Sequence, residues 1–237
     1  MSSSKESRAF REVDESAAEH EHGTVTVVRL PVPARTVRRQ GPPARRRNKD
    51  VRQREYLTPR EVEELMQAAQ ARGRNGHRDA TMILVAYRHG LRASELVALT
   101  WQQVEFNDKV MHIARRKNGV PSVHPMTGEE MRALRRLYRE QKEVGRVRAG
   151  DSVFQTEQGT PITEAGFRKM LARASADGSL RDLRIHPHML RHAAGYKLAN
   201  DGRDTRALQV YLGHRNIQHT VRYTELASDR FEGWWGK

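Results

Sequence analysis

Residues 187–199 read PHMLRHAAGYKLA, and this stretch predicts one helix with its proline at the first position. Within it, His188 and Arg191 are three residues apart, a spacing that places both side chains on one face of a helix. The next segment, residues 204–212, predicts a second helix that stops at Gly213. His214 follows directly. The stretch therefore indicates helices whose ends present cationic side chains toward a common region.

More helices are predicted upstream of this stretch and beyond it. The first starts at Thr58, because Thr58 and Glu61 can form a capping box and Pro59 suits the first helical position. An apolar run at residues 80–87 predicts a buried helix that Gly90 ends. Further helices are predicted at about 92–99, after a second capping box at 127–130, at 163–174 and at about 216–226.

One hairpin interrupts the helices. Residues 110–126 contain two β-prone runs around Asn118-Gly119, a dipeptide that suits a type I′ turn. The sequence therefore predicts a mainly α fold with one small antiparallel β-sheet, an α+β class.

Composition excludes several classes of protein. The chain has 237 residues and no cysteine, so disulfide scaffolds, thiolate metal sites and thiol nucleophiles are ruled out. The longest apolar run, residues 80–87, is far shorter than the ~20 residues of a membrane span, and no secretory signal begins the sequence. The net charge of +14 favours a polyanionic partner, either nucleic acid or an anionic membrane surface.

The charge is unevenly distributed along the chain. Residues 1–54 have few large apolar side chains and predict a disordered tail, acidic at first and then an Arg/Pro-rich basic arm. This arm is interpreted either as a phosphate-binding segment, with Arg45, Arg46 and Arg47 as candidate DNA contacts, or as a solubilising tail. A globular domain is predicted over residues 55–237, with a C-terminal tail at 224–237.

The distinctive polar residues of the globular part are basic. Two guanidiniums, two imidazoles and an ammonium describe a cage for a phosphodiester, since Arg binds two phosphate oxygens and stabilises the charge that a transition state gains. The candidates are Arg92, Lys117, His188, Arg191 and His214, with Arg115 and Arg116 as candidate DNA contacts beside Lys117. Composition and spacing alone indicate a basic, mostly helical, DNA-binding protein.

Four motifs in order resemble the tyrosine site-specific recombinases, or phage integrases. Gly90-Leu-Arg-Ala-Ser-Glu-Leu96 is similar to the first arginine box, and His188-Met-Leu-Arg-His192 to the H-x-x-R box. Leu212-Gly-His214 is similar to the LGH element, and Tyr223 stands where the family places its nucleophile. Residues 185–192 and 211–220 resemble in particular the short recombinases that invert the promoter switch of type 1 fimbriae.

The resemblance implies the tyrosine recombinase catalytic-domain fold and a site-specific recombinase that uses neither metal nor cofactor. It implies that Tyr223 attacks the scissile phosphate and forms a 3′-phosphotyrosyl bond, while Arg92 and Arg191 clamp the non-bridging oxygens. Lys117 is expected to protonate the leaving 5′ oxygen.

The resemblance also assigns roles to the remaining residues of the boxes. His188 is expected to act as the general base on the tyrosine proton, and His214 to hydrogen-bond the phosphate. Glu95 is expected to orient the site from behind, and His192 to support it by packing.

The implied partner is double-stranded DNA. The protein is expected to bind it as a homotetramer in the synaptic complex, together with accessory DNA-bending proteins. The expected location is the nucleoid in the cytoplasm, with no membrane partner. The reaction is expected to be inversion, integration or excision of a DNA segment. Two alternatives stay open: a type IB topoisomerase-like relaxer using nearly the same residues, and a non-catalytic DNA-binding regulator on the same fold.

Family members often carry a helical domain before the catalytic one, and here only the basic arm precedes it. The tail contains three large aromatic residues, Phe231, Trp234 and Trp235. They are expected to dock either on their own chain or on a neighbouring protomer.

Overall fold

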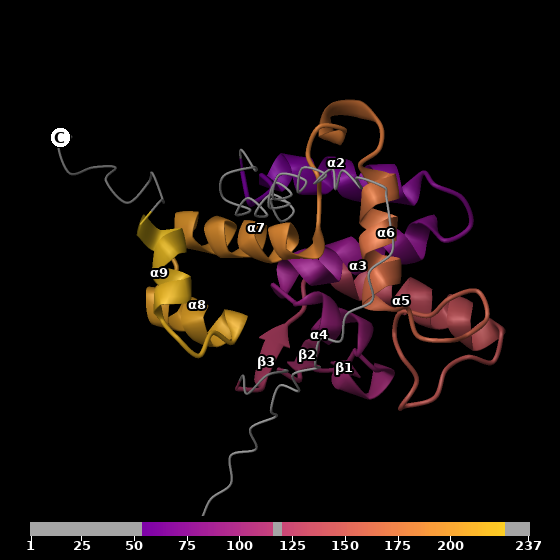
Figure 1. Ribbon diagram of the computed structural model, residues 1–237. Helices are drawn as coiled ribbons and strands as arrows, with labels where there is room; N and C mark the ends of the chain where they lie inside the picture. Colours follow the sequence, from indigo (N-terminus) through magenta and orange to yellow (C-terminus); the bar gives the residue numbers. More distant parts are fainter. Residues whose placement is uncertain (1–53, 116–119, 226–237) are drawn as a thin grey trace, which may run out of the picture. The chain divides into compact units, whose positions relative to one another are not determined.

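The computed structural model describes residues 54–115 and 120–225, all of which belong to one compact unit (Figure 1). The predicted tail up to residue 53 and the C-terminal residues 226–237 lie outside this range, and so do Arg116 and Lys117. Within the described range, no helix is both long and apolar enough to cross a membrane.

The described part of the chain is mostly helical, as predicted. The helices are α2 (Pro59–Gln70), α3 (Gly76–Arg88), α4 (Ala93–Val97), α5 (Gly128–Glu143), α6 (Glu164–Ala174), α7 (Pro187–Asn200), α8 (Thr205–Leu212) and α9 (Gln218–Glu225). Short 3₁₀ helices cover Trp101–Gln103 and Gly178–Leu180.

Local capping explains why several helices begin where the sequence predicts. At the start of α2, the Glu61 backbone N–H donates to the Thr58 hydroxyl, and the Thr58 backbone N–H donates to the Glu61 carboxylate at 2.7 Å. Thr127 and Glu130 make the same reciprocal pair at the start of α5. Both predicted capping boxes are therefore confirmed.

One three-stranded antiparallel sheet has the order β1 (Val104–Glu105), β2 (Val110–Ile113), β3 (Ser122–Pro125). Met111 pairs with His124, which confirms the predicted antiparallel pairing of the two β-prone runs as strands β2 and β3. The predicted turn at residues 118–119 lies outside the described range. Strand β1 was not predicted, because two residues are too short to show an alternating pattern.

Two clusters of buried apolar side chains form the core. The larger one surrounds α3, which packs against α2, α5 and α7 and contributes Met82 and Ile83. The smaller one joins the second half of α7 to α8 and α9, through Leu208, Leu212 and Tyr223. In Figure 1, α8 and α9 lie together at one end of α7, and β3 reaches the same region. The three consecutive helices α7, α8 and α9 thus meet a strand that lies some 60 residues earlier in the sequence.

Candidate active site

Arg191 is at the centre of this meeting point. Its side chain leaves α7 and is 1% exposed. One guanidinium nitrogen, Nη1, donates to the Gly90 carbonyl at 2.6 Å, and Nη2 donates to the Leu212 carbonyl at 2.6 Å. Burial and the charges of Arg92 and Arg115 lower the pKa of Arg191 to about 10, so it remains a cation at neutral pH. The contacts fix a buried positive charge between the start of α4 and the end of α8.

Arg92 supplies the second cation of the site, at the N-cap of α4. Its Nη1 donates to Glu95 Oε1 at 2.6 Å, and its backbone N–H donates to Glu95 Oε2 at 2.9 Å. The Arg92 side chain is 29% exposed, so part of the guanidinium is open to solvent. The tight Gly90-Leu91 turn that presents Arg92 relies on glycine, since Gly90 has a φ of +56°. The prediction that Glu95 orients the site from behind agrees with this geometry.

Glu95 also binds Arg115, at the end of β2. The distance from Arg115 Nη1 to Glu95 Oε2 is 3.0 Å, and the other end of the guanidinium donates to the Tyr211 carbonyl. Burial alone would raise the pKa of Glu95, but the Arg92 backbone N–H and the nearby guanidiniums outweigh it and hold the pKa below its usual value. The Arg115 side chain is 0% exposed. Arg115 therefore links the hairpin to α4 and α8, and its buried side chain gives no support to the prediction that it contacts DNA.

His214 follows α8 through Gly213, which adopts the left-handed conformation at a φ of +64°. Its Nδ1 lies 2.8 Å from the hydroxyl of Thr220, a side chain that is fully buried. Burial lowers the pKa of His214 to about 3, helped by the charges of Arg191 and Arg92, so the imidazole is neutral at neutral pH. The sequence gives no role to Thr220, the last residue of the 211–220 stretch, although its hydroxyl holds the His214 ring.

An open hollow of about 630 Å³ adjoins these residues. Arg92 and His214 line it, together with two arginines that the sequence analysis did not single out, Arg206 and Arg215. The rest of the lining is Gln209, Asn216, Ile217 and His219. Because three guanidiniums and no carboxylate line it, the hollow suits an anionic ligand.

Tyr223 packs beside this hollow, on α9. The side chain is 1% exposed, and its ring stacks against His214 with 6.1 Å between ring centroids. Its hydroxyl lies 2.8 Å from Nδ1 of His192. Burial raises the pKa of Tyr223 to about 12, although the charges of Arg191 and Arg222 oppose that shift. The phenol is therefore protonated at neutral pH.

The two histidines of α7 lie at different distances from the Tyr223 hydroxyl. In the described residues, the imidazole within hydrogen-bond distance of the hydroxyl belongs to His192 and not to His188, the predicted base. His188 is exposed, and its ring meets the His192 ring edge-on with 4.5 Å between centroids. Burial, and then the charge of Arg191, lower the pKa of His188 to about 4. The role of His188 as base stays a prediction, and His192 has a direct contact with the hydroxyl that the sequence did not indicate.

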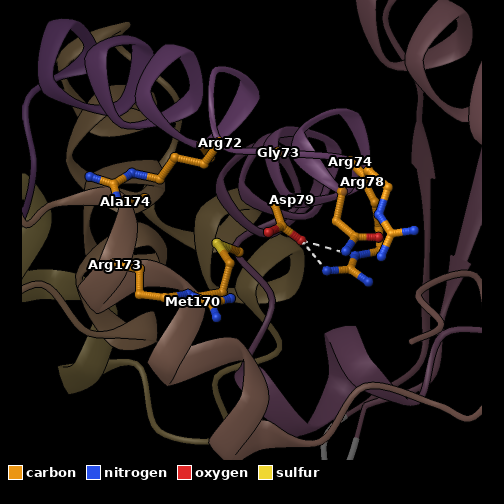
Figure 2. A pocket seen from close by; sticks show the side chains of 10 residues that line it. Arg72, Gly73, Arg74, Arg78, Asp79, Met170, Arg173 and Ala174 are labelled. Carbon is orange, nitrogen blue, oxygen red and sulfur yellow. Dashed lines mark hydrogen bonds and ion pairs between the residues drawn. The ribbon is translucent and has the colours of Figure 1, made fainter. Parts of the chain in front are cut away.

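A second arginine-rich hollow lies elsewhere, where the α2–α3 turn meets the end of α6 (Figure 2). Arg72, Arg74, Arg78 and Arg173 line it, but Arg78 pairs with Asp79 at 2.6 Å and Arg74 pairs with Glu157 at 2.9 Å. None of the predicted site residues borders this hollow. Within residues 54–115 and 120–225, no group of three or more His, Asp or Glu side chains could hold a metal ion.

The chain matches known proteins over nearly all of the described range. A model of the phage integrase family matches residues 55–230. The chain is 42% identical over 182 residues to the type 1 fimbriae regulatory protein FimE of Escherichia coli, which covers 77% of this chain and 91% of FimE. It is 34% identical over 179 residues to the tyrosine recombinase XerD of Ralstonia nicotianae, covering 73% of this chain and 56% of XerD.

Solved structures share the same fold. The XerH site-specific recombinase, solved as a post-cleavage complex with a palindromic difH substrate, aligns with a TM-score of 0.63 and 20% identity over 75% of this chain and 51% of XerH. The catalytic domain of bacteriophage HP1 integrase aligns with a TM-score of 0.53 and 20% identity over 75% of this chain and 90% of that domain. The predicted fold class is confirmed. With the family model matching most of its length, the chain belongs to the phage integrase family of tyrosine recombinases.

Proposed function

We propose that this protein is a site-specific DNA recombinase that cuts and rejoins double-stranded DNA through a 3′-phosphotyrosyl intermediate. The observation that carries the proposal is the convergence of four elements on one anion-binding site. Arg191 on α7, His214 after α8 and Tyr223 on α9 meet Arg92 at the start of α4, which lies about 100 residues earlier in the sequence.

The cations supply the electrostatic part of the reaction. A phosphodiester in the hollow would meet the exposed part of the Arg92 guanidinium, with the buried charge of Arg191 behind it. When a nucleophile adds to phosphorus, negative charge accumulates on the non-bridging oxygens. Fixed guanidiniums stabilise this charge more strongly than they stabilise the ground state.

His214 contributes a hydrogen bond. Since the imidazole is neutral, one ring nitrogen carries a hydrogen and the other does not. If the Thr220 hydroxyl donates to Nδ1, Nε2 carries the hydrogen and donates to a phosphate oxygen. In this arrangement, the buried Thr220 hydroxyl selects the tautomer of His214 that can donate to DNA.

The covalent step transfers a phosphoryl group to the phenol. The Tyr223 hydroxyl gives its proton to a base, for which His188 on α7 stays the proposed residue, as its oxygen forms a bond to phosphorus. The bond from phosphorus to the 5′ oxygen breaks, and the leaving oxygen takes a proton from an acid. Lys117, which lies outside the described residues, is proposed as the donor of that proton. The phosphotyrosyl bond retains the energy of the broken one, so the strands can be rejoined without ATP.

The outcome proposed for the whole reaction is inversion, or integration and excision, of a DNA segment. The proposed assembly is a homotetramer around two DNA sites, assisted by DNA-bending proteins and located in the nucleoid. The relatives support DNA as the partner: FimE is named a regulator of type 1 fimbriae, and XerH and the Tn1549 integrase were solved bound to DNA. A type IB topoisomerase-like relaxer, acting as a monomer, would instead change plasmid linking number without exchanging strands between sites.

Covalent trapping tests the cleavage step. The full chain is incubated with a library of genomic duplexes carrying nicks that let the 5′-hydroxyl fragment escape, and adducts are isolated under denaturing conditions. We expect adducts from the wild type and from Tyr138→Phe, a control tyrosine that packs on Trp101, and none from Tyr223→Phe. Adducts from Tyr223→Phe, or none from a wild type that binds the library, would contradict the proposal.

The trapped fragments then identify substrates for the second step. Plasmids carrying two copies of a trapped site should yield inverted or excised products with the wild type. Relaxed topoisomers without recombinant products would support the relaxer instead. Arg191→Ala should bind these sites but not cleave them, because it removes a transition-state contact among many phosphate contacts.

A further inference from the structure

We propose that His192 is a positioning residue for the nucleophile: it accepts a hydrogen bond from the Tyr223 hydroxyl and fixes the phenol against α7. The inference deepens the proposed function and rests on Tyr223 being the nucleophile. Three observations support the inference. They are the contact between His192 and Tyr223, the charge states of these two residues, and the space for the Tyr223 ring that α7 leaves one turn after His192.

The contact is short and shielded from water. His192 Nδ1 lies 2.8 Å from Tyr223 Oη. The two residues are 6% and 1% exposed, so the hydroxyl has little water to compete for its hydrogen. A buried hydroxyl that lost this partner would carry an unsatisfied polar group, which gives the pair a strong preference to stay together.

The charge states allow the hydrogen bond in this direction. Burial, together with the charges of His188 and Arg222, lowers the pKa of His192 to about 3, so the imidazole is neutral at neutral pH and one of its two ring nitrogens has a free lone pair. Burial raises the pKa of Tyr223 to about 12, so the phenol keeps its proton. In the proposed tautomer the hydrogen is on Nε2, so the Tyr223 hydroxyl donates and Nδ1 accepts.

The same values distinguish positioning from general-base catalysis. Moving the proton from the phenol to His192 would place an imidazolium beside Arg191 and Arg222, which disfavour it. His192 instead sets the direction of the phenolic oxygen and its lone pairs. Alignment of this kind accounts for a large part of the rate of a reaction between held groups.

Gly195 leaves space for the Tyr223 ring against α7. It lies one turn after His192 on α7, and a Cβ there would come within 2.7 Å of Cε2 of Tyr223. Its φ is not positive, so the backbone does not demand glycine. Glycine in a helix interior costs roughly 1 kcal/mol relative to alanine. The approach of the Tyr223 ring explains why this position has no side chain.

Two substitutions separate positioning from proton transfer. In His192→Asn, the amide oxygen can take the place of Nδ1 as an acceptor but cannot take up a proton. His192→Leu retains bulk and removes the acceptor. His77→Asn is the matched control, because His77 bonds the Ala133 carbonyl on the α3–α5 side of the core. The readouts are DNA affinity and single-turnover cleavage of a nicked suicide duplex.

We expect His192→Asn to cleave within threefold of the wild type, and His192→Leu to cleave ~10–100-fold more slowly with unchanged DNA affinity, as lost alignment predicts. His77→Asn should match the wild type. If His192→Asn loses as much activity as His192→Leu, proton transfer is the role and the positioning proposal is overturned. If His192→Leu cleaves normally, the contact has no role in the reaction, which also overturns it.

A measurement without DNA tests the contact independently of folding defects in those variants. The ¹⁵N resonance of His192 Nδ1 is compared in the wild type, Tyr223→Phe and the control Tyr138→Phe. We expect a shift toward the value of an unbonded ring nitrogen in Tyr223→Phe alone, and no shift would overturn the proposal. If the shift occurs while the wild type forms no covalent adduct, the proposed function fails and His192 is a structural contact only.

Discussion

Arg115 and Glu95 form a fully buried ion pair, with 3.0 Å between Nη1 and Oε2 and side-chain exposures of 0% and 1%. The carboxylate binds Arg92 on its other side. The pair therefore connects the hairpin to the start of α4, and Arg115 extends the connection to α8 through the Tyr211 carbonyl.

Replacing Arg115 with Met should destabilise the protein and slow cleavage together. Removing one partner of a buried ion pair typically costs about 3–5 kcal/mol, because the other charge is left without its partner. Arg92 still pairs with Glu95, so we expect the lower part of that range in urea unfolding. The matched control is Arg136→Met, whose exposed pair with Glu140 should be worth under about 0.5 kcal/mol. Equal stability of the two variants would show that the buried pair is not structural.

The arginines that line the hollow should each affect the salt dependence of DNA binding. Arg206→Ala and Arg215→Ala remove guanidiniums from the lining. If each contacts a phosphate, the slope of log affinity against log salt should become shallower by about 0.9 per residue. Fluorescence anisotropy across a salt series measures this slope. Arg74→Ala, in the second hollow beside Glu157, should leave the slope unchanged, and an equal change there would refute the assignment.

Stability should fall in acid, in part because of His124. Burial, then the charges of His89 and Arg115, lower its pKa from 6.5 to about 3 in the folded protein. Between these two values the unfolded chain binds more protons than the folded one, so the free energy of unfolding decreases as the pH falls from about 6.5 toward 3. The slope from one such group is up to about 1.4 kcal/mol per pH unit.

His124→Asn tests this in urea unfolding at a series of pH values. The variant should be less stable at pH 7, since His124 is packed against Tyr211, yet its stability should depend less steeply on pH below 6. His112→Asn, at an exposed histidine on the neighbouring strand, is the control. If the stability of His124→Asn depends on pH below 6 as steeply as the stability of the wild type does, His124 titrates normally in the folded state.

The basic arm, which lies outside the described residues, makes a separate prediction. Deleting residues 1–50 should weaken DNA binding and make its salt dependence shallower, because each lost phosphate contact reduces the slope by about 0.9. Deleting only the acidic residues 1–21 should neither weaken DNA binding nor make its salt dependence shallower. Unchanged binding by the longer deletion would leave Arg45, Arg46 and Arg47 as part of a solubilising tail.

Local features of the fold were predictable because their causes are local. Thr58 and Glu61 are three residues apart, and their reciprocal hydrogen bonds need nothing beyond one helical turn. The β2–β3 pairing was likewise predictable from the two β-prone runs around Asn118-Gly119. The two-residue strand β1 was not, because its pairing with Met111 and Val110 is set by the fold around it.

The site was predictable as a set of residues but not as a set of contacts. Arg115 occurs in an Arg-Arg-Lys run that suggests solvent exposure, and only the packing of α8 against the hairpin buries it. His188 and His192 are four residues apart on α7 and share a face, so spacing cannot say which imidazole meets Tyr223. That choice depends on where α9 docks, which is a tertiary contact.

The hydrogen bonds of Arg191 have a consequence for how this site can change over time. Its acceptors are the carbonyl oxygens of Gly90 and Leu212, which belong to the main chain. No single nucleotide change in the gene can delete a carbonyl oxygen, whereas a carboxylate partner could be lost in one step. The central cation therefore keeps both acceptors as long as the backbone path is kept, and at position 90 that path itself favours glycine.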